Sequence, residues 1–348
     1  MTAVWLSGHG SNEVVSIAPH QAPEPSPGEL RLRMHAATLN QVDLYMRNSG
    51  AGITHRIPQV MGLDGCGMVD AVGPGETQFK PGDAVVVHPG IGCGRCEFCQ
   101  RGEGVLCLRV AYLGEHRNGT WCSQLTLPAT NVFAKPAFLS EAEAATLGVT
   151  YLTAWRMLVT KAQIKPWETV LIFGVGGGVS VAALQLARAM GATCIVTSRH
   201  ADKLERARAL GADHGIHAPP EDVARRVMDI TGGRGVDVVI ENVGEAVWPA
   251  AMKSLVRGGR LVTCGATSGD QPPADLRRIF IRQLQIFGST LGDLHEMQDL
   301  LRFIERHQLR PAIDRTYPMD EVHAALDRLS QAQQFGKLVL QIAPSPSA

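Results

Sequence analysis

From Glu168 onward the chain alternates short apolar runs with amphipathic ones, and this rhythm is the strongest constraint on its fold. Strand-like runs occupy 169–174, 193–198, 236–244, 259–269 and 284–292, and helical patterns occupy 179–191 and 201–211. Both helical patterns end at a glycine, which is a common helix stop. Alternation of this kind predicts an α/β domain built on a doubly wound parallel sheet.

A glycine-rich turn joins the first of these strands to the first helix. It reads Gly174, Val175, Gly176, Gly177, Gly178 and Val179. Glycines let the backbone approach a pyrophosphate, and the helix N-terminus favours its charge. Val179 stands where such loops often carry a third glycine. We expect this turn to bind a dinucleotide; the alternative is a tight βα turn without a ligand.

The end of the second strand indicates which dinucleotide is preferred. Enzymes that use NAD usually carry a carboxylate there, which binds the ribose hydroxyls. This chain has Ser198 and Arg199, with Lys203 one helical turn further on. A hydroxyl and two cations suit a 2′-phosphate, so we predict NADPH. The alternative is that the two cations are ordinary solvated charges at a helix start.

Four cysteines lie within fifteen residues, at Cys93, Cys96, Cys99 and Cys107. Four thiolates in one loop can close a tetrahedron around zinc and leave no position open for a substrate. We therefore predict one structural Zn²⁺ per chain; the alternative is a reduced or partly oxidised loop without metal. The surrounding residues, from the N-terminus to about 136, read as short strands broken by turns and predict an irregular β domain.

Composition narrows the class of partner. The 348 residues are 45% hydrophobic and 19% charged, with a formal net charge of zero. No basic field points to nucleic acid or to a membrane surface, and no signal-like or membrane-spanning run is present. We expect a cytoplasmic protein whose partner is a small-molecule substrate.

Several motifs resemble the medium-chain dehydrogenase/reductase superfamily over nearly the whole chain. They are GLDGCGMVDAVG at 62–73, the four cysteines, TYLTAW at 150–155, the glycine-rich turn and GKLVL at 336–340. The stretch from Asn40 to Arg47 is similar to the quinone oxidoreductase-like branch. The resemblance implies a GroES-like catalytic domain at 1–150 and 291–348, and a Rossmann domain at 151–290.

The resemblance also implies that the catalytic zinc is lost. Where zinc-dependent members carry a Cys, a His and a Cys or Asp, this chain carries Asn40, Leu63 and Val149. None of these is a useful zinc ligand. The carboxylate after the missing histidine survives as Asp64. The alternative is a substitute metal site built from Asp64 and His116.

Further cofactor contacts and a homodimer follow from the same resemblance. The implied contacts are Thr153, Asn242, Gly244, Gly265, Ala266, Thr290, Leu291 and Lys337. The family commonly pairs its nucleotide domains through a sheet edge, which 259–292 would hold here.

Without a zinc that stabilises an alkoxide, a reductase can still add hydride to an activated double bond. The developing enolate then needs hydrogen-bond donors and a proton. We predict Tyr45 as the proton donor and Asn40 as an amide donor, with Arg47 steering a carbonyl or an anionic group. The sequence thus favours an NADPH-dependent reductase of an enone, enoyl or quinone substrate. An alcohol dehydrogenase or carbonyl reductase, and a nucleotide-binding protein with little catalysis, are the alternatives.

Overall fold

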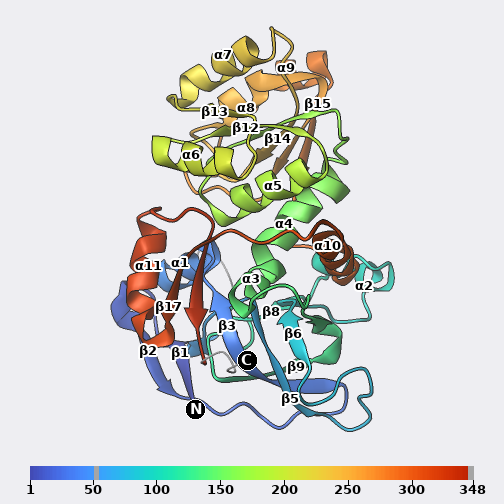
Figure 1. Ribbon diagram of the computed structural model, residues 1–348, viewed down its shortest axis with the longest axis vertical. Coiled ribbons are helices and arrows are strands. Elements are labelled where there is room, and N and C mark those ends of the chain that lie inside the picture. Colours follow the sequence, from blue (N-terminus) through green and yellow to red (C-terminus); the bar gives the residue numbers. More distant parts are fainter. Residues whose placement is uncertain (51–54, 344–348) are drawn as a thin grey trace. The chain divides into compact units, whose positions relative to one another are not determined.

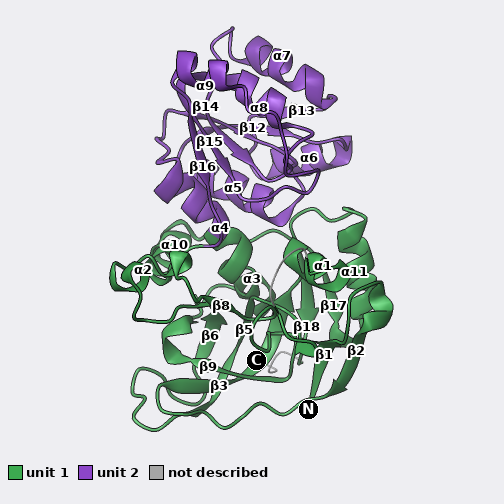
Figure 2. Cartoon of the chain, turned by 180° about the vertical axis from the view of Figure 1, so that it is seen from behind, with its two compact units in different colours: residues 1–152, 292–348 green, residues 153–291 purple. Residues whose placement is uncertain are grey.

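A computed structural model describes residues 1–50 and 55–343. The chain forms two compact units, coloured separately in Figure 2. Unit 1 is Met1–Leu152 with Gly292–Ala348, and unit 2 is Thr153–Leu291. The mixed α/β class, with an irregular β domain and a parallel-sheet domain, is confirmed.

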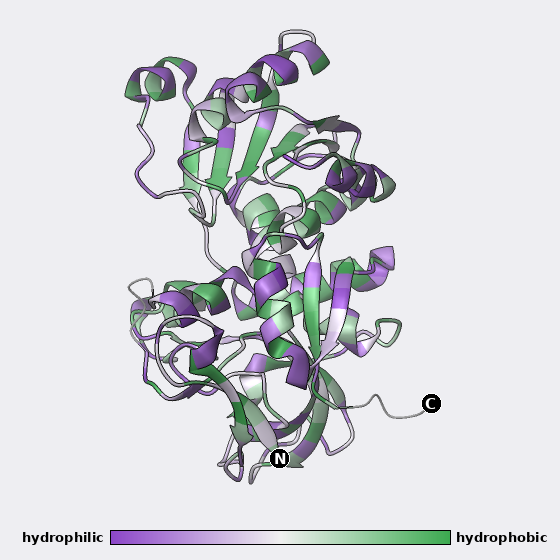
Figure 3. Ribbon diagram, turned by 90° about the vertical axis from the view of Figure 1, so that its left-hand side faces the viewer, coloured by the Kyte–Doolittle hydropathy of each residue, from purple (hydrophilic) through white to green (hydrophobic). Residues whose placement is uncertain are grey.

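Unit 2 is built on a six-stranded parallel sheet of order β13-β12-β11-β14-β15-β16. Its strands are β11 (Thr169–Ile172), β12 (Thr193–Thr197), β13 (His214–Ile216), β14 (Val236–Glu241), β15 (Leu255–Thr263) and β16 (Gln285–Gly288). Their side chains are hydrophobic along most of the sheet, as Figure 3 shows, because helices cover both faces.

The helices of unit 2 are α5 (Gly178–Ala189), α6 (Ala201–Ala209), α7 (Pro220–Ile230), α8 (Trp248–Ser254) and α9 (Leu276–Arg282). Helices α5 and α6 lie on one face of the sheet, and α7 and α8 lie on the other (Figure 1). The strand order therefore reverses between β11 and β14. In doubly wound sheets such a switch point is where ligands bind, beyond the carboxyl ends of the strands.

Unit 1 holds a seven-stranded sheet of order β10-β6-β5-β3-β18-β17, with β9 also paired to β3. Smaller sheets are β2-β1-β4 and β7-β8. The strands are β1 (Thr2–Leu6), β2 (Val15–Pro19), β3 (Glu29–Thr38), β4 (Gln59–Val60), β5 (Gly65–Val72), β6 (Ala84–Val87), β7 (Gly90–Ile91), β8 (Ala111–Tyr112), β9 (Gln124–Pro128), β10 (Val132–Ala134), β17 (Ile313–Pro318) and β18 (Lys337–Gln341).

The C-terminal segment completes this unit, because β18 pairs with β3. Its helices are α1 (Gln41–Asn48), α2 (Glu97–Gln100), α3 (Glu141–Ala145), α10 (Leu294–His307) and α11 (Val322–Ser330). Short 3-10 turns complete it at η1 (Asn12–Val14), η2 (Gly104–Leu106), η3 (Ala129–Asn131) and η6 (Met319–Glu321). One core cluster joins Leu44 and Met46 of α1 to Leu326 of α11 and Leu340 of β18. This packing fixes α1 beside the C-terminal strand.

The pattern at 140–162 predicts one continuous helix, and the structure differs. The capping box at Ser140 and Glu143 does begin α3, as expected. After it the backbone opens into π turns at η4 (Leu147–Tyr151) and η5 (Arg156–Lys161), on either side of α4 (Leu152–Trp155). Gly148 shows why a side chain is excluded in the first π turn: a Cβ there would lie 2.3 Å from the Val87 carbonyl oxygen and 3.0 Å from the Asp64 Cβ. Single-turn π segments of this kind are frequent at functional sites.

Candidate active site and metal positions

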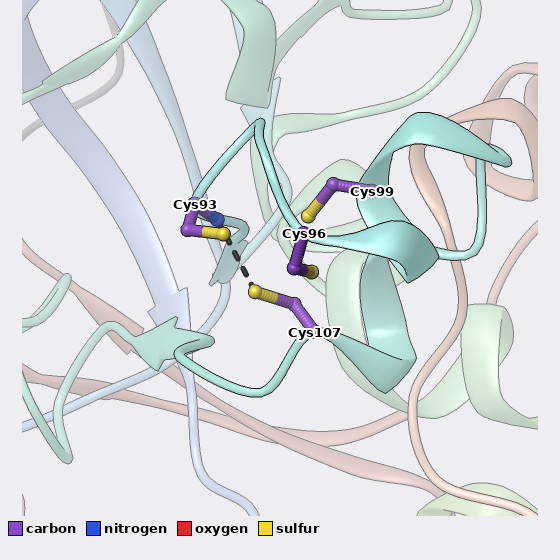
Figure 4. A group of neighbouring side chains, drawn as sticks. All are labelled: Cys93, Cys96, Cys99 and Cys107. Atoms are coloured by element: carbon purple, nitrogen blue, oxygen red, sulfur yellow. Dashed lines mark hydrogen bonds between the residues drawn. The ribbon is translucent and has the colours of Figure 1, made fainter.

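The structure brings the four predicted cysteine ligands together in one loop, the cysteine lobe (residues 93–107). Their sulfur atoms all lie within 4.8 Å of one another, and Figure 4 shows the side chains turned toward a shared centre. The Cys107 Sγ accepts backbone N–H groups from Cys93 and Arg109, each at 3.3 Å. Four converging sulfurs with N–H donors behind them fit a structural zinc.

The thiols of the lobe differ in acidity. Backbone N–H groups, that of Arg95 first, lower the pKa of Cys93 to about 5, and the N–H of Cys99 lowers the pKa of Cys96. Desolvation, followed by contacts with the neighbouring thiols, raises the pKa of Cys99 to about 11. Thiolates packed this closely repel one another, so full ionisation needs a cation at the centre.

The three positions at which the sequence predicts lost zinc ligands, Asn40, Leu63 and Val149, also lie in unit 1. Asn40 is the N-cap of α1, and its side-chain Nδ2 donates to Asp64 Oδ1 at 2.9 Å. Leu63 is buried beside Asp64. Gly148, which precedes Val149, lies against the Asp64 side chain. The positions are close in space, but none of the three side chains offers a zinc ligand.

A hydrogen-bonded network surrounds Asn40 and Asp64. We call it the Lys337 cluster (Thr38, Asn40, Asp43, Asp64 and Lys337). The Lys337 ammonium donates to the Leu39 carbonyl oxygen and to Asn40 Oδ1, each at 2.7 Å. Thr38 Oγ1 donates to Asp64 Oδ1 at 2.6 Å, and the Asn40 N–H donates to Asp43 Oδ2 at 2.7 Å. Asn40 therefore bridges an ammonium and a carboxylate through the two ends of one amide.

The charges of the cluster are all buried, and Lys337 is only 2% exposed. Burial raises the pKa of Asp64 and lowers that of Lys337, while the attraction between the two charges opposes both shifts. Burial, opposed in part by the Asn40 N–H, raises the pKa of Asp43 to about 8. Asp64 Oδ2 has no hydrogen-bond partner among the described residues.

This donor set does not fit a catalytic zinc. Within 1–50 and 55–343, the metal-capable groups of three or more His, Cys, Asp or Glu residues are the cysteine lobe and the set of Asp293, His295 and Glu296. Asp293 and Glu296 form a capping box at the start of α10, which accounts for the second set. Neither Asp64 nor His116, the predicted alternative pair, belongs to these groups: Asp64 Oδ1 accepts from Thr38 and Asn40, and His116 Nδ1 accepts the Tyr112 N–H at 3.2 Å.

The predicted catalytic residues of α1 have different surroundings. Tyr45 is half-buried, its hydroxyl makes no hydrogen bond to the part of the chain described, and burial raises its pKa. Arg47 is buried, and its guanidinium donates to Asn12 Oδ1 and to Asn48 Oδ1 at 2.5–3.0 Å. One Arg47 donor therefore holds the N-terminal segment onto α1 through Asn12, and the other two bond to Asn48 within α1 itself.

In unit 2 the predicted cofactor residues gather at the carboxyl edge of the sheet. Gly174, with φ 64°, begins the turn after β11, and Gly177 is the N-cap of α5. The Val175 N–H donates to the Thr197 carbonyl oxygen at 2.8 Å, which ties the turn to β12. The N-terminus of α5, at Gly178 and Val179, thus lies beside the end of β12, where Ser198 and Arg199 follow.

Neighbouring turns complete this edge. Asn242 Nδ2 donates to Ser180 Oγ at 3.2 Å, so the turn after β14 contacts the start of α5. A Cβ on Gly244 would lie 3.0 Å from the Ala266 Cα, and one on Gly265 would lie 3.2 Å from the Asn242 carbonyl oxygen. The buried Glu241 carboxylate accepts the Gly244 N–H at 2.7 Å and fixes this turn.

The remaining predicted contacts are more scattered. Ser198 Oγ accepts the His200 N–H at 3.1 Å, Arg199 is exposed, and Lys203 is buried on α6. Thr290 and Leu291 follow β16, and Thr153 lies in α4. Lys337, by contrast, belongs to unit 1, where its ammonium bonds to Leu39 and Asn40.

Sequence reasoning missed the pairing of Lys337 with Asn40, and it missed Glu115. Nearly 300 residues separate the first pair, and the lysine sits in an ordinary strand-like run. Glu115 is a buried carboxyl in a glycine-containing turn. Its only signal in the sequence is its place beside His116, the residue that the sequence suggests as a substitute metal ligand.

Comparison with known proteins agrees with this architecture. Residues 26–137 match the family described as Alcohol dehydrogenase GroES-like domain, and residues 178–306 match Zinc-binding dehydrogenase. No helix among the described residues is long and apolar enough to cross a membrane.

Three similar proteins span nearly the whole chain. A "NAD-dependent alcohol dehydrogenase" of Saccharolobus solfataricus is 30% identical over 91% of this chain and 94% of its own length. A solved "NAD-dependent alcohol dehydrogenase" is 42% identical, with a TM-score of 0.95, over 99% of this chain and all of its own. A solved "Crotonyl-CoA Carboxylase/Reductase" is 26% identical, with a TM-score of 0.91, over all of this chain and 89% of its own. The chain therefore belongs to the zinc-type, alcohol dehydrogenase-like medium-chain dehydrogenase/reductase superfamily of oxidoreductases.

Proposed function

We propose that this oxidoreductase is an NADPH-dependent reductase that adds hydride to an activated carbon–carbon double bond or a quinone without a catalytic zinc. The observation that carries the proposal is the Lys337 cluster. In it the Asn40 amide, at a predicted lost zinc ligand, accepts from the Lys337 ammonium and donates to the Asp64 carboxylate, which supports chemistry without a metal there. The quinone oxidoreductase-like branch, with a structural zinc added in the cysteine lobe, is the part of the superfamily that this arrangement fits.

The proposed chemistry follows from which charge needs stabilising. Alcohol oxidation needs an alkoxide, which catalytic zinc normally stabilises, and the Lys337 cluster offers no open metal coordination. When bound, the reduced nicotinamide supplies hydride. Addition to the β-carbon of an enone or enoyl group leaves an enolate, whose oxygen hydrogen-bond donors stabilise. Tyr45 is the proposed donor to that oxygen, because burial keeps its phenol protonated. Asn40 is the second proposed donor.

The engagement of Arg47 with Asn12 and Asn48 bears on its proposed role. Its guanidinium is committed to side chains of unit 1. We therefore propose that Arg47 affects the substrate indirectly, because it holds α1 in place and so positions Tyr45 and Asn40.

Preference for NADPH rests on the end of β12. The positions that follow it carry Ser198, Arg199 and His200, with no carboxylate to repel a 2′-phosphate. Arg199→Asp should lower kcat/KM with NADPH at least tenfold and leave kcat/KM with NADH less affected. Equal effects on both cofactors would contradict a phosphate-binding role for Arg199. The similar proteins named NAD-dependent make this comparison necessary.

A structural zinc in the cysteine lobe and a homodimer complete the proposal, with the cytoplasm as the expected location. Strand β16 is an edge of the unit 2 sheet, and exposed Leu276, Phe280, Ile281 and Ile286 lie on α9 and β16. Such side chains suit pairing with a second copy of this chain along the strand. Solution scattering at micromolar concentration should give twice the chain mass; a monomeric mass contradicts the dimer.

The decisive experiment combines metal content with substrate class. Protein purified without added metal should hold about one zinc per chain and reduce enones and quinones, but not simple aldehydes, with NADPH. The names of the most similar proteins favour a second candidate, an alcohol dehydrogenase or carbonyl reductase. Two zinc ions per chain with aldehyde turnover would establish that candidate. NADPH binding without turnover on any electrophile would support a nucleotide-binding role instead.

A further inference from the structure

A buried carboxyl outside the Lys337 cluster lacks the contacts that such a group normally needs. Glu115 lies between β8 and β9 and is 8% exposed. No hydrogen bond from the described residues reaches its carboxyl oxygens, which keep slight contact with solvent, and His116 Nδ1, which accepts the Tyr112 N–H, lies 4.0 Å away. Buried carboxylates are nearly always paired or hydrogen-bonded, so an orphan of this kind needs a functional or a solvent explanation.

The fold holds this residue beside the Lys337 cluster. A Cβ on Gly114 would lie 2.6 Å from the Gly62 carbonyl oxygen, and one on Gly119 would lie 2.1 Å from it. The turn that carries Glu115 therefore lies directly against the backbone before Leu63 and Asp64. Thr120 Oγ1, at the end of the turn, donates to the Asp64 carbonyl oxygen at 2.9 Å.

The carboxyl groups around Glu115 outnumber the cations near them, and burial raises the pKa values of these carboxyls. Asp43, Asp64 and Glu115 are three buried carboxyls, and Lys337 is the buried ammonium that faces the first two. Burial raises the pKa of Glu115 to about 7, and its charge contributes to the raised pKa of Asp43. On the outer side stands His116, whose pKa is lowered by burial and then by the neighbouring His55.

We propose that Glu115 is the acid that protonates the α-carbon of the enolate formed by hydride addition, a role that rests on the proposed function. The hydride and its electron pair form the new bond at the β-carbon. The enolate electrons then take the Glu115 proton at the α-carbon, and the carboxylate left behind regains a proton from water beside His116. Every proton and electron pair is thereby supplied by the reduced cofactor, the carboxyl or water.

Two donors then have separate tasks. Tyr45 keeps its proton and hydrogen-bonds the enolate oxygen, because its pKa is raised from an already high value. Glu115 exchanges its proton near neutral pH, where general acids work best. Because this carboxyl has no hydrogen bond within the described residues, none has to be broken before the proton is transferred.

The test uses Glu115→Gln, which keeps the shape and removes the transferable proton, with Glu115→Asp as the conservative variant. Exposed Glu13→Gln is the matched control. Each is assayed on an enone with whichever reduced nicotinamide supports wild-type turnover, from pH 5 to 9. A second readout is the facial distribution of deuterium at the α-carbon of the product formed in D2O.

We expect Glu115→Gln to lower kcat/KM by about 10²–10⁴-fold. It should also lose the fall in rate near pH 7 and place deuterium on both faces. Glu115→Asp should retain that fall and part of the rate, and Glu13→Gln should match the wild type. A Glu115→Gln enzyme with the wild-type rate, pH profile and single-face labelling overturns the role of Glu115 and leaves the proposed function standing. A wild type without enone turnover overturns both.

Discussion

The cysteine lobe and the Lys337 cluster lie in the same unit, and both gather side chains that ionise to negative charge. The lobe has four thiols within 4.8 Å of one another and Arg109 at its rim, 3.6 Å from the Cys93 sulfur. The cluster has two buried carboxyls and, among them, the Lys337 ammonium. One region therefore needs an external cation, whereas the other carries its own.

This difference teaches that the proposed loss of a metal site involves more than missing ligands. In the proposed correspondence Asn40 stands in place of a zinc-binding cysteine, and its amide accepts from Lys337 and donates to Asp64. The surviving carboxylate then keeps a positive neighbour without any zinc. A buried charge that loses every partner is far more costly than one that exchanges partners.

The largest effect is expected in the lobe, from Cys96→Ser. Zinc per chain should fall from about one to near zero, because a tetrahedral site rarely survives with three thiolates. Structural zinc contributes about 10–16 kcal/mol of binding energy in isolated zinc fingers, so the lobe should unfold locally. Elemental mass spectrometry and limited proteolysis at 93–107 would measure both effects.

Cys264→Ser in unit 2 is the control for the lobe, since Cys264 lies outside the metal-capable groups of the described residues. It should keep its zinc and resist cleavage as the wild type does. If Cys96→Ser kept a full zinc ion, the bound metal would have to lie elsewhere, and the contrast between the two regions would collapse.

The next effect is expected at Lys337→Met, which removes the internal cation. Asp64 would then lose the nearby positive charge to which Asn40 links it, and removing one member of a buried ionic network costs about 3–5 kcal/mol. Urea unfolding at pH 7 measures this loss. Exposed Lys80→Met should change stability by less than about 0.5 kcal/mol.

A second substitution separates the charge interaction between Lys337 and Asp64 from the packing of the lysine side chain. In the Lys337→Met background, Asp64→Asn should cost less than it does alone, because it removes the carboxylate that the first change left unpaired. Additive losses in the free energy of unfolding would show that Asp64 and Lys337 act independently. The Lys337 ammonium would then not balance the charge of the Asp64 carboxylate.

The two regions also differ in how far the sequence predicts them. The lobe is local: four cysteines within fifteen residues restrict the loop so tightly that the ligand set follows from spacing. The glycine turn is equally local, and the alternation after Glu168 predicts the parallel sheet around it. Strand β13 and helices α7, α8 and α9 are not predicted by these patterns: β13 has three residues, α8 has seven, and α9 exposes most of its apolar side chains.

The Lys337 cluster is non-local, and for that reason the sequence predicted only half of it. The absence of zinc ligands at Asn40, Leu63 and Val149 follows from the resemblance alone. What replaces them depends on the pairing of β18 with β3, which sets Lys337 beside Leu39. The π turn at Leu147–Tyr151 was equally hidden, since Gly148 within it lies against Val87 and Asp64, which are distant in the sequence.

A smaller effect, of opposite sign, is expected for the stability of Glu115→Gln. The folded pKa of Glu115, about 7, lies above the ordinary value of 4.5, so the wild type loses stability as pH rises from about 4.5 to 7. Above pH 7 the deficit is complete and is on the order of 3 kcal/mol. Glu115→Gln should therefore unfold at a higher urea concentration than the wild type at pH 8, and at a similar one at pH 4.5.

Glu13→Gln again serves as the control, and it should leave the pH dependence of stability unchanged. A Glu115→Gln protein that is less stable than the wild type at pH 8 would mean that the carboxylate is well paired in solution. Fewer buried carboxylates near the Lys337 cluster would then lack a balancing partner than the structure indicates.

The smallest effect on stability is expected for Tyr45→Phe. This variant tests whether the Tyr45 hydroxyl contributes to stability as the side chains of the Lys337 cluster do. Tyr45 lies on α1 between the buried Leu44 and Met46, but its hydroxyl bonds to nothing in the described residues. Removing it should change the free energy of unfolding by less than about 0.5 kcal/mol. Enone turnover should nevertheless fall by about 10²–10³-fold, the usual effect of deleting one oxyanion donor. Unfolding and kcat measured on one preparation separate the two. A stable variant with full turnover removes Tyr45 from the chemistry, and an unstable one makes it part of the cluster.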